Sequence, residues 1–211
     1  MFRFLLVVAA LVAAPAAASP ARPLVLAFGD SLTAGYGLEP GLGFAPQLQA
    51  TLRRHGIAAR VADGGVTGDT SAAGRARLTW TLDGLGETPD LVIVELGAND
   101  MLRGLDPAET ERNLDAILSE LARRKIPALL AGMRGAPNLD PAYVQRIEAI
   151  YPRVAQRHRA ALYPFFLDGV ATVPGMVQPD GMHPTFEGVK AIVLGITPAV
   201  KRELGVLVRQ R

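Results

Sequence analysis

Apolar runs of strand length alternate with stretches of helical length along most of this chain. The apolar runs occupy residues 24–28, 57–62, 91–96, 128–131 and 161–165; helices are expected over residues 45–54, 71–83, 141–158 and 185–204, and after the capping residue Asp106. This alternation predicts parallel strands with helices on both faces, a doubly wound three-layer α/β/α sandwich. In such sheets ligands bind beyond the carboxyl ends of the strands, so functional residues are expected there.

The first residues have the order of a secretory signal peptide. Arg3 supplies a positive start, residues 4–14 are uninterruptedly apolar, and residues 15–19 are small apart from one proline. Cleavage is expected after Ala18 and at the latest after Ala21, which leaves a single domain over residues 22–211. The apolar run is too short for a mature membrane span, and a retained anchor is the alternative. The sequence therefore predicts a periplasmic or secreted protein with no stable membrane span after processing.

Composition narrows the classes of partner. The chain has no cysteine, so an exported domain cannot use disulfides and depends on its apolar core. Its formal net charge is only +2, and no basic stripe with interleaved aromatic residues is present. We therefore expect no nucleic-acid partner.

Polar, glycine-punctuated turns follow the expected strands. Gly29-Asp30-Ser31 follows the first strand, residues 63–70 follow the second, residues 97–100 follow the third, and residues 180–184 lie between the fifth strand and the last helix. Since the carboxyl ends of parallel strands meet at one edge of a sheet, these loops are expected to lie together.

The residue types in these loops fit acyl transfer. Ser31 is a candidate nucleophile, which needs a base to take its proton. His183 is the candidate base because Asp180, three residues earlier in a constrained loop, can orient its imidazole. His55 and His158 lie in arginine-rich helix ends and are expected at the surface. The alternatives are that Ser31 caps a helix and that Asp180 and His183 form an incidental turn pair.

An oxyanion hole needs several donors directed at one point. The backbone N–H of Ser31 at the start of a helix is one candidate. The N–H of Gly68 can approach a ligand closely because the residue has no side chain. The side-chain amide of Asn99 is the third candidate, and its alternative role is a helix or turn cap.

The four loops resemble the four sequence blocks of the SGNH (GDSL) hydrolases. The matching stretches are GDSL at residues 29–32, GVTGDTSAAG around Gly68, VELGANDMLRG around Asn99, and DGMHP around His183. The likeness is closest to the bacterial thioesterase/arylesterase/lysophospholipase branch and runs from Leu24 to the last helix. It implies a flavodoxin-like sandwich with a five-stranded parallel sheet and no cofactor, and no metal ligand is expected. It also implies the triad Ser31, Asp180 and His183 and the oxyanion donors Ser31, Gly68 and Asn99.

Three positions depart from the family pattern. Asp63 stands where asparagine is expected, and Ala98 stands where glycine is usual. Neither is a catalytic position, although Asp63 could alter how the Gly68 loop is held. Residues 134–138 look shorter than the loop expected there, which bears on substrate range more than on chemistry.

The sequence thus predicts a serine esterase that hydrolyses carboxylic esters or thioesters through an acyl-enzyme on Ser31. Medium-chain acyl, aryl or lysophospholipid esters are the expected substrates, because Val173, Met176 and Val177 precede the histidine loop and could line an acyl channel. The same apolar residues could equally serve core packing. The alternative functions are a flavodoxin-like flavin-binding module, a carbohydrate acetylesterase using the same centre, and a catalytically idle envelope domain.

Overall fold

The structure is a computed structural model that describes residues 22–136 and 138–210. The predicted signal peptide, residues 1–18, lies outside the described residues. The strands are β1 (Leu24–Gly29), β2 (Arg60–Gly65), β3 (Leu91–Glu95), β4 (Ala128–Ala131) and β5 (Ala161–Tyr163). The helices are α1 (Ser31–Ala34), α2 (Phe44–Arg54), α3 (Ser71–Gly84), α4 (Ala98–Leu102), α5 (Pro107–Arg123), α6 (Pro141–Glu148), α7 (Ile150–His158) and α8 (Phe186–Gln210). Among the described helices, none is both long and apolar enough to cross a bilayer.

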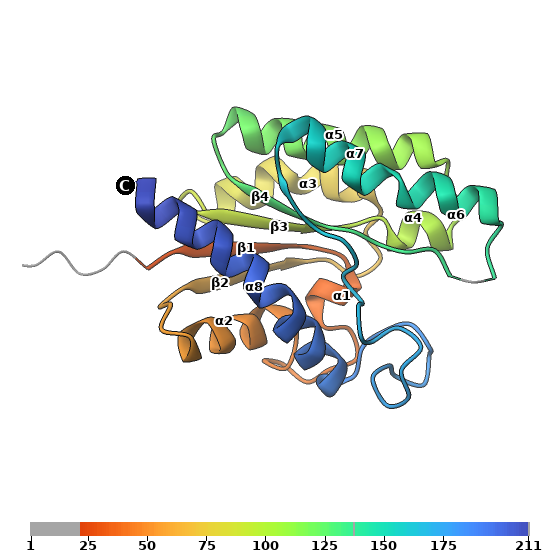
Figure 1. Ribbon diagram of the computed structural model, residues 1–211, viewed down its shortest axis with the longest axis horizontal. Helices are drawn as coiled ribbons and strands as arrows, with labels where there is room; N and C mark the ends of the chain where they lie inside the picture. The colour runs from red at the N-terminus through yellow and green to blue at the C-terminus, as the bar shows by residue number, and fades with distance from the viewer. Residues whose placement is uncertain (1–21, 137, 211) are drawn as a thin grey trace, which may run out of the picture.

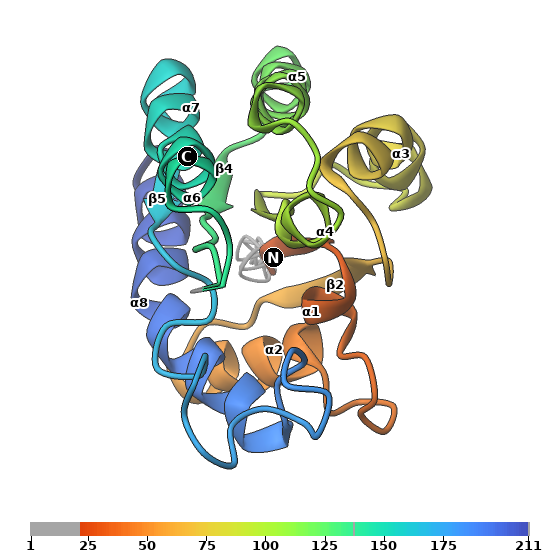
Figure 2. The same cartoon turned by 90° about the vertical axis from the view of Figure 1, so that its right-hand side faces the viewer.

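The five strands form one parallel sheet in the order β2-β1-β3-β4-β5. Helices α3, α5 and α7 cover one face, and α2 and α8 cover the other (Figure 1; Figure 2). The predicted three-layer sandwich with a flavodoxin-like parallel sheet is therefore confirmed. The strand order changes direction between β1 and β3. Ligands are therefore expected to bind beyond the carboxyl ends of these two strands.

The central strands explain why the sheet lies in the middle layer. Every residue of β1 and β3 is buried, as expected for parallel strands covered on both faces. The register places Gly29, the last residue of β1, opposite both Gly65 of β2 and Glu95 of β3. Three strands consequently end level with one another, so the loops that follow them begin side by side.

Element boundaries differ from the predicted ones where local hydrogen bonding decides. Strand β2 begins three residues later than expected because α2 ends in a closing turn, in which the Ile57 N–H donates to the Leu52 carbonyl at 3.0 Å. The helix expected over residues 141–158 divides into α6 and α7, since Pro152 has no N–H to continue the ladder across the junction. Strand β5 stops at Tyr163, before Pro164, for the same reason.

Candidate active site

The turn after β1 places Ser31 at the first position of α1. Asp30 caps this short helix, and its Oδ1 accepts a hydrogen bond from the Leu32 N–H at 2.9 Å. Asp30 is fully buried and Ser31 is nearly so, with 7% of its surface exposed. The strand-to-helix turn therefore holds the serine hydroxyl at the carboxyl edge of the sheet.

Ser31, His183 and Asp180 form a continuous hydrogen-bonded row. The Oγ of Ser31 lies 3.0 Å from Nε2 of His183, and Nδ1 of His183 lies 2.7 Å from Oδ2 of Asp180. The other Asp180 oxygen accepts from the N–H groups of Met182 at 2.9 Å and His183 at 3.0 Å. An ionised carboxylate only accepts, so Nδ1 carries the proton and Nε2 is free to accept one from Ser31.

The charge of Asp180 is fixed by these donors. The hydrogen bond from the His183 ring, followed by those from the backbone N–H groups of Met182 and His183, lowers the pKa of Asp180 to about 2. Asp180 is therefore ionised wherever a histidine titrates. The structure brings together the three residues that the sequence singled out from two distant segments.

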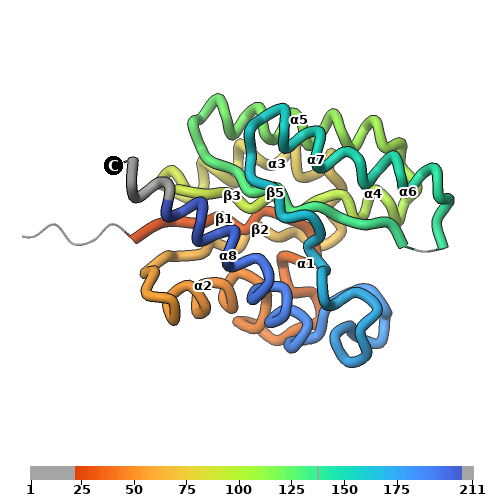
Figure 3. The backbone as a smooth tube through the Cα atoms, viewed as in Figure 1, coloured from red at the N-terminus to blue at the C-terminus, as the bar shows by residue number. Residues whose placement is uncertain are grey.

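The loop that carries Asp180 and His183 is closed at its base by backbone pairing. The Gln178 N–H donates to the His183 carbonyl at 2.7 Å, and Val177 forms an antiparallel bridge with Pro184. The Gln178 side-chain amide also donates to the carbonyls of Tyr36 at 2.7 Å and Pro184 at 2.9 Å. The loop after β5 therefore meets the α1–α2 connection, at the same end of the sheet as α1 (Figure 3).

The sequence interpretation did not identify Tyr36 and Gln178, which contact the loop that carries His183. The Tyr36 ring lies against the His183 ring, with centroids 4.5 Å apart. The chain at Gly37 passes close to the Gln178 amide, and a side chain at residue 37 would collide with it. The two glycines that flank Tyr36 were the available signal, since both have positive φ angles.

The three candidate acyl-channel residues lie at the start and base of this loop. Met176 and Val177 are half-buried and pack against the core, while the N–H of Val173 donates to the Val170 carbonyl at 3.1 Å. The carbonyl of Met176 also accepts from the Thr185 N–H at 2.9 Å. Met176 and Val177 thus pack against the core, and the acyl channel stays a prediction.

Two of the three predicted oxyanion donors are unengaged. Gly68 has a φ of +85°, a conformation that favours glycine. In the part of the chain that the structure describes, no acceptor is found for the N–H of Gly68 or of Ser31. Both groups are consequently available to a ligand.

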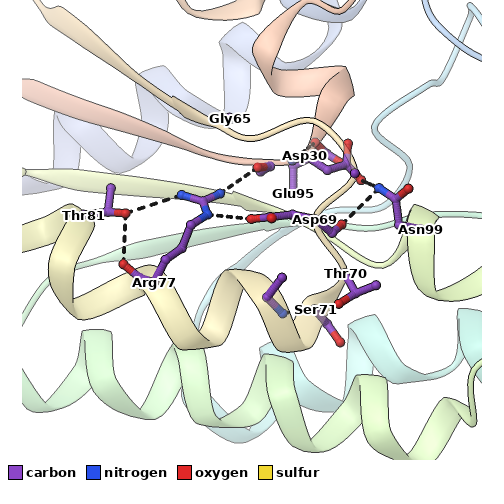
Figure 4. A network of polar contacts seen from close by, with 12 residues as sticks. Asp30, Gly65, Asp69, Thr70, Ser71, Arg77, Thr81, Glu95 and Asn99 are labelled. Atoms are coloured by element: carbon purple, nitrogen blue, oxygen red, sulfur yellow. Dashed lines mark hydrogen bonds and ion pairs between the residues drawn. The ribbon is translucent and has the colours of Figure 1, made fainter.

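Asn99, the third predicted donor, is engaged twice. Its Nδ2 donates to Oδ2 of Asp30 at 3.0 Å and to the carbonyl of Asp69 at 3.0 Å (Figure 4). These acceptors adjoin Ser31 and Gly68 in the chain, so Asn99 links the loops after β1, β2 and β3. An amide has two hydrogens, so donation to an oxyanion requires one of these bonds to be shared or released.

Arg77 of α3 joins the same loops from behind. Its Nη2 donates to the Gly29 carbonyl at 2.9 Å. Its Nε pairs with the Asp69 carboxylate at 2.5 Å (Figure 4). The guanidinium also lies over the Phe28 ring, 4.1 Å from its centroid. Arg77 thereby ties the end of β1 to the turn that contains Gly68. No periodic pattern in the sequence predicts this contact.

The two departures from the family pattern in these loops are accommodated locally. Gly97 is the residue with positive φ, at +115°, whereas Ala98 begins α4 in ordinary helical geometry. Asp63 accepts a hydrogen bond from the Gly65 N–H at 2.9 Å and so closes the end of β2. Neither residue is a member of the triad.

Comparison with known proteins agrees with this geometry. Residues 27–191 match the GDSL-like lipase/acylhydrolase family. Esterase TesA of Pseudomonas aeruginosa is 38% identical over 181 residues, covering 86% of this chain and 89% of that protein. Thioesterase 1/protease 1/lysophospholipase L1 of Escherichia coli (strain K12) is 35% identical over 164 residues, covering 78% and 76%.

A solved structure adds a match in three dimensions. The crystal structure of AlinE4, described as an SGNH-hydrolase family esterase, is 49% identical and superposes with a TM-score of 0.75. The match covers 89% of this chain and 99% of that one. The resemblance predicted from the sequence is confirmed: the chain belongs to the GDSL-like lipase/acylhydrolase family.

Proposed function

We propose that the protein hydrolyses carboxylic esters and thioesters through an acyl-enzyme on Ser31. The observation that carries the proposal is the hydrogen-bonded row from Ser31 through His183 to Asp180 at the carboxyl edge of the sheet. The family and the names of its relatives support ester hydrolysis over the flavin-binding alternative. A colourless purified protein with esterase activity is the expected outcome; a yellow, inactive protein would support the flavin module.

The contacts suggest a two-stage reaction. The Ser31 oxygen attacks the carbonyl carbon of the ester while its proton passes to Nε2 of His183. The resulting oxyanion accepts hydrogen bonds from the N–H groups of Ser31 and Gly68 and from Asn99. Collapse expels the alcohol or thiol, which takes the proton from the imidazolium. Water then attacks the acyl-enzyme, with His183 again acting as base, and releases the acid.

Mutation of Asn99 distinguishes a role as an oxyanion donor from a role in linking the loops. Replacing Asn99 by alanine is expected to lower kcat by about 10²–10³-fold with little change in KM, because the donor acts on charge that develops in the transition state. Since Asn99 also bonds Asp30 and Asp69, Tm is expected to fall as well. Both quantities are measured on the same purified variant. Near-normal kcat with a lower Tm would restrict Asn99 to linking loops.

The natural substrate is proposed to carry a medium-length acyl chain. Three large apolar side chains beside the catalytic loop are well exposed, namely Tyr36 at 50%, Met182 at 46% and Phe186 at 40%. Together with Val173, Met176 and Val177 they would offer apolar surface to an acyl chain bound at Ser31. An acyl chain bound on this surface would remove it from water, and the free energy gained is about 25 cal/mol per Å² of apolar surface buried.

A substrate panel tests this proposal. We expect kcat/KM for p-nitrophenyl esters to rise from acetate to medium-chain acyl groups, and thioesters and lysophospholipids are assayed beside them. A panel that peaks at acetate, or activity confined to acetylated polysaccharide, would contradict the proposal and favour the carbohydrate esterase. The relative named thioesterase and lysophospholipase motivates the two additional substrate classes.

We further propose that residues 1–18 are a signal peptide, which is removed after Ala18 or at the latest after Ala21. The single hydrolase domain over residues 22–211 would then act in the periplasm or outside the cell. The positive start and the apolar run of the sequence support this. N-terminal sequencing of protein recovered outside the cytoplasm tests it. A chain that still begins at Met1 would contradict it.

A further inference from the structure

A buried glutamate lies directly beneath the serine turn. Glu95, the last residue of β3, has no exposed surface. Its Oε2 accepts hydrogen bonds from the Thr33 hydroxyl at 2.7 Å and from the Asp30 N–H at 3.4 Å. Its Oε1 is buried and has no donor among the described residues. Burying an ionised carboxylate oxygen without a hydrogen-bond donor costs free energy, which favours the protonated form of Glu95.

Asp30, the neighbouring carboxyl group, differs from Glu95 in having hydrogen-bond donors for both oxygens. It is fully buried, yet both its oxygens accept hydrogen bonds, from the Leu32 N–H and from the Asn99 amide. The two carboxyl groups also act on each other, since each changes the pKa of the other. Two carboxyl groups can share a hydrogen bond only if one of them carries a proton. Burial raises the pKa of Asp30 to about 6, while the Leu32 N–H and the Asn99 amide favour its ionised form, so at neutral pH the shared proton is assigned to Glu95.

The surrounding charges agree with this assignment. Burial, and next the charge of Asp30, raise the pKa of Glu95 well above its ordinary value of 4.5. Arg77, on α3, pairs with Asp69 and reaches this turn at the Gly29 carbonyl. Tyr151 of α7 donates to the Leu96 carbonyl, and burial raises its pKa, so its hydroxyl stays neutral. The charge of His183, when protonated, acts on Asp30 and favours the Asp30 anion.

We propose that Glu95 is a neutral carboxylic acid in the working enzyme and that it shares its proton with the Asp30 carboxylate. Asp30 in turn holds the Asn99 amide at the oxyanion site. Glu95 is thus a positioning residue that acts through Asp30 on Asn99. This inference deepens the proposed function, on which its activity readout rests.

The proton has a consequence for stability. The unfolded chain loses the Glu95 proton above the ordinary pKa of 4.5, whereas the folded protein keeps it to higher pH. The folded state therefore binds more protons in this window, and its stability falls as pH rises through it. A variant without this titration escapes the loss.

Glu95→Gln is the informative substitution because glutamine has the shape and the donor of the protonated acid. Its amide can donate to Asp30 while its carbonyl accepts from Thr33. We expect kcat to stay within about threefold of wild type, whereas Glu95→Leu, which lacks the donor, lowers kcat by roughly tenfold, the factor of about one hydrogen bond, with little change in KM. We also expect the Tm of Glu95→Gln to exceed that of wild type by a margin that grows as pH rises above 4.5.

An infrared measurement reads the proton without any assay of activity. At neutral pH the wild-type spectrum should contain the C=O stretching band of a protonated carboxyl, and Glu95→Gln should lack it. Glu187→Gln, at an exposed position of α8, is the matched control and should keep the band. Absence of the band in wild type, or a loss of kcat in Glu95→Gln equal to that in Glu95→Leu, would overturn the proposal.

These readouts separate the two levels of inference. If Ser31 were not the nucleophile, the infrared band and the pH dependence of Tm would still report the Glu95 proton. If Glu95→Leu does not fold, Glu95→Gln and the spectrum still decide.

Discussion

Replacing Ser31 by alanine is expected to lower kcat/KM for ester hydrolysis by about 10⁴-fold or more, as removal of a nucleophile does in other triads. The substitution removes the Ser31 Oγ, which lies 3.0 Å from Nε2 of His183. The N–H of residue 31 remains, so substrate binding and part of the oxyanion site survive. Activity is measured with p-nitrophenyl esters on protein freed of contaminating esterases.

Ser119→Ala is the matched control for this experiment. Ser119 is an exposed residue of α5, far along the chain from the active-site loops, and its loss should leave kcat/KM unchanged. Both variants should retain the wild-type circular dichroism spectrum. A Ser31→Ala protein that keeps most of its activity would remove Ser31 from the mechanism.

His183→Ala is expected to lose activity to a similar degree, because the variant lacks the imidazole whose Nε2 lies 3.0 Å from the Ser31 Oγ. In wild type, kcat/KM should fall in acid, since the imidazole accepts the serine proton only when neutral. Asp180 adds no second acidic limb at these pH values, because its pKa is held to about 2. His55→Ala, at an exposed helix end, is the control and should retain both rate and pH profile.

Asp180→Ala should be milder than His183→Ala. The imidazole remains, but it loses the 2.7 Å bond that fixes its tautomer and orientation. Asp180 also accepts from two backbone N–H groups of its own loop, so some loss of order in the loop is expected. An Asp180→Ala enzyme with undiminished rate would reduce the proposed triad to a Ser31–His183 dyad.

The positions of the candidate catalytic residues followed from the sequence for a physical reason. Apolar strands that alternate with helices must be parallel, and parallel strands end at one edge. Gly29, Gly65 and Glu95 lie in one register, so the turns after β1, β2 and β3 meet there. The turn of Ser31 could therefore be placed from the strand ends, whereas His183 was singled out by Asp180 three residues earlier and by the surface positions expected for His55 and His158.

The supporting contacts were not accessible in the same way. Glu95 reads as one polar residue at the end of an apolar strand, and only the packed structure shows that it lies under Asp30. Arg77 and Gln178 each bond backbone carbonyls of distant loops, a contact that no periodicity encodes. The double engagement of Asn99 likewise depends on where three loops come to rest.

Covalent labelling tests the role of Ser31 most directly. The full-length hydrolase domain is treated with a fluorophosphonate, digested, and analysed by peptide mass spectrometry, with Ser31→Ala and Ser119→Ala treated in parallel. We expect an adduct on the peptide that contains Ser31, in wild type and Ser119→Ala, formed in step with the loss of esterase activity and absent from Ser31→Ala. Inactivation of the wild-type enzyme with the adduct on another residue, or hydrolysis that continues after Ser31 is fully labelled, would contradict the assignment of Ser31 as the nucleophile.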